Sequence, residues 1–196
     1  MLTMAIQSNA DSIKKTMARE RKNLEFATAR ALTWTGRDAK EAVEKSLPTR
    51  FDRPTAFTKR AVAAIPARRN KMYSRVLIKD AQAKYLNIQE EGGTRTPSGR
   101  ALVVPVGIRL NRYGNIPRAG VRRALGRADT FSGVVRGVGG IWQRQRNGSV
   151  KLLVAYESQA TYQPRFNFRA TTGKAAERVF PEKFAESFRQ AMETAR

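Results

Sequence analysis

Apolar and small residues recur at steps of three and four along residues 11–47, a spacing that predicts one long amphipathic helix. The residues with this spacing are Ile13, Met17, Leu24, Ala27, Ala31, Leu32, Ala39, Val43 and Leu47. Asp11 or Ser12 can cap its first turn, and Gly36 predicts a bend or a break. Pro48 predicts its end, because the residue before a proline avoids the helical region. The helix would measure about 50 Å, more than a small domain needs for its own core, so we expect part of it to pack on another subunit.

Shorter patterns in the middle of the chain predict strands. Two β-like runs at 61–66 and 72–79, separated by the polar residues 67–71, predict a hairpin with a basic tip. Further strands are predicted at 101–106, 131–138, 141–145 and 150–156, the first of them short and buried, with turns at 111–114, 139–140 and 146–148. Residues 94–100 predict a flexible basic loop between these elements.

Three further helices are predicted around these strands. One covers 80–91, where Asp80 can cap the start and two glycines end it. A second covers 118–125 and lies between a proline and a glycine. The third begins near Asn167, and Pro181 must kink or split it. Its predicted apolar stripe consists of Ala175, Val179, Phe184, Phe188 and Met192.

These elements predict an α+β fold with a central antiparallel β-sheet that carries basic hairpins and loops. We expect a single domain over residues 1–196. Within it we assign 1–47 to the N-terminal helix, 49–165 to the sheet and docking loops, and 167–195 to the C-terminal helix kinked near Pro181.

The composition removes most familiar catalytic machinery. The chain has 196 residues with 38 Lys+Arg, 16 Asp+Glu, no His and no Cys, which gives a formal net charge of +22. Zinc fingers, Ser-His-Asp and Cys-His arrangements and disulfide frameworks are therefore excluded. The start of the chain lacks the apolar core of a signal peptide, and no apolar run is long enough for a membrane span, so we expect no membrane partner.

The surplus charge lies in two segments. Residues 45–79 carry a net +9 and residues 92–156 a net +11, whereas the helical ends are nearly balanced. A merely soluble surface needs a net charge of only about 2–8 for a small domain. The distribution instead predicts a middle segment that faces a polyanion or an acidic partner.

No pattern in the chain indicates an enzyme, a cofactor or a metal. The glycine-rich stretch 133–140 lacks the spacing of a phosphate-binding loop and does not lead into a helix. A metal nuclease could use Asp80, Glu90 and Glu91. Consecutive residues point apart on a helix, however, so Glu90 and Glu91 cannot easily share one ion, and we expect them to form salt bridges with the arginine-rich middle.

Arginines with aromatic neighbours favour nucleic acid as a partner. The groups are Arg109, Arg112 and Tyr113; Trp142, Arg144 and Arg146; and Tyr162, Arg165 and Phe166. Such aromatic rings can stack on bases, although Trp142 and Phe166 could equally belong to a core or a subunit contact. Non-specific attraction to phosphates needs only charge. A non-specific DNA-binding architectural protein is therefore one functional hypothesis.

The order of several motifs resembles a family of tailed-bacteriophage virion proteins, the minor tail protein Z-like or tail-completion (neck) proteins. The similarity covers roughly residues 11–190 and is most specific in the loop Phe51-Asp52-Arg53-Pro54-Thr55-Ala56-Phe57-Thr58 and in the turn Tyr113-Gly114-Asn115-Ile116-Pro117. Val76-Leu77-Ile78-Lys79-Asp80, Ala83-Lys84-Tyr85-Leu86, Gln89 to Arg95 and Leu102-Val103-Val104-Pro105 add to it.

The resemblance implies a small α+β subunit that forms a ring in the phage neck. Such a ring completes the tail and joins it to the head connector around the DNA channel, next to the tail terminator or tail tube. We expect a homo-oligomer, a hexamer or a dodecamer, located in the virion and made in the host cytoplasm. The family motifs are structural, so no catalytic residues carry over.

Six basic residues are the predicted contacts with DNA or with an acidic neighbouring ring. They are Arg68, Arg69, Lys71, Arg95, Arg100 and Arg112. We expect their side chains to face the partner and not the subunit core, so that reversing three of these charges impairs assembly without unfolding the subunit.

Overall fold

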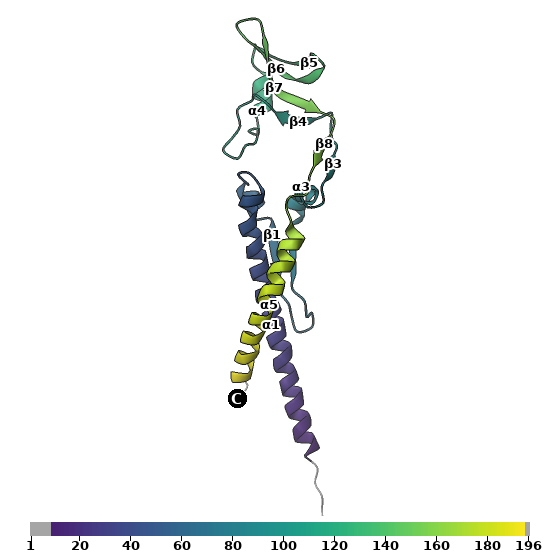
Figure 1. Cartoon of the computed structure of the whole chain (residues 1–196), viewed down its shortest axis with the longest axis vertical. Coiled ribbons are helices and arrows are strands. Elements are labelled where there is room, and N and C mark those ends of the chain that lie inside the picture. Colours follow the sequence, from purple (N-terminus) through teal and green to yellow (C-terminus); the bar gives the residue numbers. More distant parts are fainter. Residues whose placement is uncertain (1–8, 195–196) are drawn as a thin grey trace, which may run out of the picture. The chain divides into compact units, whose positions relative to one another are not determined.

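The structure, a computed structural model, describes residues 9–194 (Figure 1). It confirms the α+β class, with a long N-terminal helix, antiparallel strands in the middle and a C-terminal helix. The described chain divides into two compact units, residues 9–45, 62–79 and 168–194 in the first and residues 46–61 and 80–167 in the second. The single domain over 1–196 stays a prediction, and residues 1–8 and 195–196 lie outside the described part.

The first unit consists of two helices and a hairpin. Its elements are α1 (Ala10–Arg50, except the last turn), β1 (Val62–Ile65), β2 (Arg75–Ile78) and α5 (Phe168–Glu193). The predicted hairpin is confirmed, because β1 and β2 pair antiparallel from Val62 opposite Ile78 to Ile65 opposite Arg75. Figure 1 shows α5 alongside α1, and the ammonium of Lys183 lies 5.8 Å from the ring centroid of Trp34.

Gly36 does not break α1. A Cβ at this position would collide with the Ser74 hydroxyl, so the glycine leaves room for the hairpin to approach the helix. One hydrogen bond joins the hairpin to the helix, because the Thr33 hydroxyl accepts from the Ala67 amide at 3.1 Å. Within the hairpin, the Ser74 hydroxyl donates to the Ile65 carbonyl at 2.9 Å.

The end of α1 also differs from the prediction, because the helix includes Pro48 and continues to Arg50. A proline in the last turn removes only one backbone donor, and the bonding around it persists. The Phe51 amide donates to the Leu47 carbonyl at 3.0 Å, and the Thr49 hydroxyl donates to the Ser46 carbonyl at 2.8 Å.

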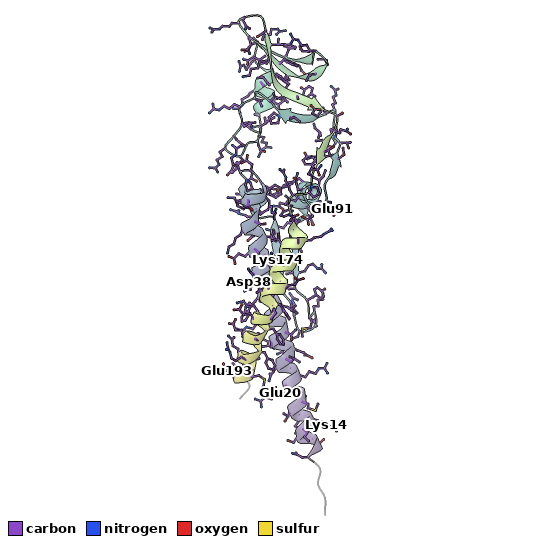
Figure 2. The ribbon with its side chains drawn as sticks, in the orientation of Figure 1. Lys14, Glu20, Asp38, Glu91, Lys174 and Glu193 are labelled. Carbon is purple, nitrogen blue, oxygen red and sulfur yellow. The ribbon has the colours of Figure 1, made fainter. Side chains whose placement is uncertain are left out.

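The burial of α1 changes along its length. Ala27, Ala31, Ala39 and Val43 are buried, but the apolar residues from Ile13 to Leu24 are exposed. Exposed fractions are 55% for Ile13, 67% for Met17 and 46% for Leu24. Figure 2 shows Lys14 and Glu20 on this same part of the helix.

The C-terminal helix α5 is continuous, so Pro181 does not split it. Its predicted apolar stripe is only partly correct. Ala175 is buried as expected, but the other buried residues are Ser187 and Ala191, and both Phe188 and Met192 are more than a third exposed. Phe180, Phe184 and Phe188 form a ladder of rings with centroid separations of 5.8 and 6.1 Å.

The second unit contains three helices and two sheets. The helices are α2 (Ala56–Lys59), α3 (Asp80–Glu91) and α4 (Gly120–Leu125). One sheet has four antiparallel strands in the order β4 (Leu102–Pro105), β7 (Val150–Glu157), β6 (Val138–Arg144) and β5 (Thr130–Val135). The other pairs β3 (Gly93–Arg95) with β8 (Ala160–Tyr162). The core under the larger sheet contains Ala124, Ile141, Leu153 and Val154.

Several predictions in this unit were wrong in detail. The strand expected at 101–106 is β4, which is an exposed edge strand and not a buried one. Part of the loop expected at 94–100 is strand β3. The turn expected at 139–140 lies at Arg136 and Gly137, which adopt φ values of 50° and 80°. Gly140 is instead inside β6, where a Cβ would collide with the Val154 carbonyl.

Candidate nucleic-acid interface

The tip of the hairpin gathers positive charge in the first unit. Arg68 and Lys71 exchange backbone hydrogen bonds of 3.0 and 2.8 Å, which close the tip. With Tyr73 and Arg75 they line a hollow of about 340 Å³. The Arg75 guanidinium lies 5.6 Å from the centroid of the Tyr73 ring. These four residues, the hairpin cluster, form an exposed basic surface with one aromatic ring.

Arg69 lies in the same tip but has a packing contact. Its guanidinium carbon is 5.8 Å from the centroid of the Phe26 ring on α1. A cation held over an aromatic ring at this distance is weakly stabilising at an exposed site. Arg69 therefore links the hairpin to α1, while its side chain remains exposed.

A larger basic hollow, here called the arginine pocket, lies in the second unit. Its volume is about 700 Å³, and four arginines line it: Arg109, Arg112, Arg123 and Arg127. The first two come from the loop after β4, and the other two come from α4 and the turn after it. Apolar side chains of this unit, among them Ile108 and Leu153, form part of the lining.

One of these arginines is neutralised, and the neutralising carboxylate is well held. Arg127 donates to both oxygens of Asp129, at 2.9 and 2.7 Å, and the Gln143 amide donates to the same carboxylate at 2.7 Å. The hydrogen bond from Arg127, followed by that from Gln143, lowers the pKa of Asp129. The same pairing raises the pKa of Arg127. Asp129 therefore remains charged and fixes Arg127 at the edge of the pocket.

Arg112 is positioned by the turn that carries it. Asn111 accepts backbone hydrogen bonds from Tyr113 at 2.9 Å and from Asn115 at 3.1 Å through its side-chain oxygen. The Arg112 guanidinium lies 4.7 Å from the Tyr113 ring centroid and donates to the Tyr113 hydroxyl at 2.6 Å. The predicted turn at 111–114 is confirmed, and Gly114 adopts a φ of 76° within it.

The remaining two predicted residues lie outside these clusters. Arg95 is on β3 opposite Ala160. Arg100 lines a separate hollow of about 580 Å³ together with Tyr156 and Glu157. All six predicted residues are exposed, but only Arg68 and Lys71 share one hollow, and their contact with DNA or a partner stays a prediction.

The sequence reasoning missed most of the arginine pocket. It selected Arg112 as a contact and noted Arg109 beside it, but it did not select Arg123 or Arg127. A usable signal was present, because residues 92–128 contain eight arginines and no carboxylate. Two aromatic candidates for base stacking, Trp142 and Phe166, are buried and belong to the interior of the second unit.

The two most specific motifs of the family resemblance meet in the second unit. The loop at 51–58 and the turn at 113–117 both line a hollow of about 190 Å³. Phe51 packs on Phe166 with ring centroids 5.6 Å apart, and Arg165 lies over Phe51 at 5.3 Å. Arg53 pairs with Asp52 at 2.9 Å, and its hydrogen bond lowers the pKa of Asp52. These contacts give the motif residues a structural role.

Comparisons of the chain with protein families, with curated proteins and with solved structures find no match. The resemblance to tail-completion proteins therefore stays a prediction.

The described residues contain neither a cluster that could hold a metal ion nor a helix that could span a membrane. Within residues 9–194, no three carboxylate, His or Cys side chains gather closely enough to hold a metal ion. Asp80 lies at the start of α3, and Glu90 and Glu91 lie at its end. Across the same residues, no helix combines the length and the apolar character needed to span a bilayer.

Proposed function

We propose that this chain is a non-enzymatic structural protein of a tailed phage. In this proposal its copies form a ring, a hexamer or a dodecamer, in the neck of the virion. The ring completes the tail and joins it to the head connector around the DNA channel, with the tail terminator or tail tube as the other neighbour. The protein is made in the host cytoplasm and uses no cofactor.

The observation that carries the proposal is the uncovered apolar stripe of α1. Ile13, Met17 and Leu24 lie at helical spacing on one line, and the line continues into the buried residues Ala27 and Ala31. The same face is thus exposed from Ile13 to Leu24 and covered from Ala27 onward. Subunits that assemble into a closed ring bury such a face against the next copy.

The charge distribution supports a channel around DNA. The chain carries +22, and basic hollows occur in both units, at the hairpin cluster and at the arginine pocket. Copies with this charge repel one another unless a polyanion or an acidic partner lies between them. DNA in the channel supplies that compensation.

Electron microscopy of particles made without the protein tests the proposal. We expect filled heads and separate tails that fail to join, and a copy of the wild-type gene should restore joined particles. Normal infectious particles in the absence of the protein would refute the proposed function.

The arginine pocket also favours a second candidate, a DNA-binding architectural protein that acts in the cell. This candidate predicts that particles assemble normally without the protein and that the protein distributes along host or phage DNA. The location of the protein decides between the two, because a neck protein is found in purified virions at a fixed copy number.

A further inference from the structure

We propose that the arginine pocket binds the phosphate groups of a nucleic-acid backbone. The proposal rests on the proposed function only in that the DNA channel would bring nucleic acid to the protein. The four arginines come from two separate parts of the chain, and the fold of the second unit places them around one hollow of about 700 Å³.

The charge balance of the pocket strongly favours an anion. In the described part of the chain, Arg127 has a carboxylate partner, whereas Arg109, Arg112 and Arg123 have none within salt-bridge distance. Asp129, the partner of Arg127, is fully engaged by Arg127 and Gln143. Three guanidiniums therefore remain available for a ligand, and all three side chains are exposed.

The backbone under the pocket is held in place before any ligand binds. The amides of Val106, Gly107 and Ile108 all donate to the Leu153 carbonyl, at 3.0, 3.0 and 3.1 Å. A Cβ at Gly107 would lie 2.7 Å from the Leu152 carbonyl oxygen, so this loop rests directly on β7. On the other side, the Thr130 hydroxyl donates to the Ala124 carbonyl at the end of α4. The arginines thus project from fixed backbone, which reduces the entropy lost on binding.

The type of side chain fits a phosphate. The three available cations are guanidiniums, whose planar donor groups match phosphate oxygens in a bidentate geometry. Arg112 is further oriented by its contact with the Tyr113 ring. A lysine-rich surface would supply charge without this geometry.

The extent of the charge favours a long polyanion over a short acidic peptide. Arg118 and Arg122 lie between the two halves of the pocket in sequence and are also exposed. Residues 92–128 contain no carboxylate at all. A nucleic-acid backbone presents one negative charge at every nucleotide, so it can contact the pocket and its flanking arginines together.

The test compares duplex binding by the full-length wild type and by the triple variant R109Q/R112Q/R123Q. The probe is a short fluorescein-labelled duplex of arbitrary sequence, followed by fluorescence anisotropy over a salt series. We expect the variant to bind on the order of 10- to 100-fold more weakly. The slope of log K against log salt should become shallower by about 0.9 for each arginine that neutralises a phosphate, and hence by about 2.7 in total.

A second triple variant with the same charge change is the matched control. K174Q/R178Q/R189Q removes three exposed basic residues of α5 in the first unit, and Figure 2 labels Lys174 on that helix. This control should retain most of the affinity and most of the slope. The conservative variant R109K/R112K/R123K keeps the charge but loses the bidentate geometry, so it should bind with intermediate affinity.

Three outcomes would overturn the proposal. The first is equal loss in the pocket variant and in the α5 control, which would show that only overall charge matters. The second is unchanged binding by the pocket variant, with its folding verified by circular dichroism. The third is tighter, pocket-dependent binding of a polyglutamate peptide than of a duplex with equal charge, which would assign the pocket to an acidic protein. These measurements need no phage particles, so they can fail independently of the proposed neck function.

Discussion

Gly36 shows how a single residue can serve packing at the expense of local helix stability. It lies inside α1, where glycine is less stable than alanine by about 1 kcal/mol. The hairpin residue Ser74 occupies the space that a Cβ would need. Gly173 provides the contrast, because it also lies in a helix, α5, but has open space where its Cβ would be.

We predict that G36A lowers the free energy of unfolding although alanine is the better helix former. Inserting a methyl group into a filled site typically costs about 1–3 kcal/mol, which exceeds the gain in propensity. G173A is the matched control and should stabilise by up to about 1 kcal/mol. Urea unfolding measures the free energy of unfolding of G36A and of G173A relative to the wild type. If S74G fails to lessen the effect of G36A in the double variant, the clash is not its cause.

At Asp129, a single ion pair makes stability depend on pH. Because the folded-state pKa of Asp129 is lowered by Arg127 and Gln143, its contribution is present above the unfolded pKa, about 3.9, and is lost as the pH falls through the folded pKa. We predict that D129N has a lower Tm than the wild type at neutral pH and that this difference shrinks below about pH 4. D38N also removes one negative charge, and it is the control for the change in net charge. A pH-independent difference would contradict the assignment.

At the scale of elements, the apolar face of α1 is buried along one part of the helix and exposed along another. Ala27 and Ala31 are covered within the first unit, whereas Ile13, Met17 and Leu24 are exposed. Exposed apolar side chains that recur at helical spacing indicate an interaction site, and Glu20 lies on the same face between Met17 and Leu24. The exposed part is therefore the element on which self-assembly should depend.

We predict that I13S/M17S/L24S weakens self-association and leaves the subunit folded, since these side chains contribute little to its own core. Sedimentation velocity should show a shift toward smaller species at the same protein concentration. K15S/R19S/K22S places three serines on the opposite face of the same helical stretch as a control. Equal effects of the two variants would attribute the change to helix destabilisation.

Elements with strong local signals could be predicted from the sequence, and elements fixed by distant contacts could not. The hairpin at 61–79 has two β-like runs around a polar tip, and α3 lies between Asp80 and two glycines; both elements were found. The pair β3–β8 joins segments that are distant in the chain and that are only three residues long, too short for any pattern. Gly140 could not be assigned to a strand from the sequence either, because only its packing against β7 distinguishes it from a turn glycine.

The same distinction applies to the candidate site. The hairpin cluster consists of neighbours in sequence, so the basic tip was predictable. The arginine pocket combines the loop after β4 with α4 and its following turn, and only the folded unit shows that Arg109 and Arg127 line one hollow. The distribution of charge along the sequence identified the basic segment 92–156. It did not show that the arginines of this segment line one pocket.

For the molecule as a whole, the net charge is large, and the chain has no side chain of the type that ordinarily titrates near neutral pH. The chain has 38 Lys+Arg and no His, the residue whose ordinary pKa lies between pH 5 and 8. Attraction to DNA should therefore depend on salt and hardly on pH. The proposed binding would therefore differ from that of proteins that release their ligand on acidification.

We predict that duplex affinity changes by less than about twofold between pH 6 and pH 8, but by more than about tenfold between 50 and 200 mM salt. Fluorescence anisotropy in buffers of matched ionic strength measures the first effect, and a salt titration at one pH measures the second. A strong pH effect at constant ionic strength would show that a group other than the ordinary basic side chains controls binding.

The division into units has a consequence for the order in which the protein is built. The second unit lies within the sequence of the first, whose three described segments are 9–45, 62–79 and 168–194. During synthesis, the second unit can fold once residue 167 has left the ribosome, whereas the first must wait for α5. The helix that carries the proposed ring contact thus belongs to the unit that is completed last, so the ring contact should form only after the second unit is able to fold.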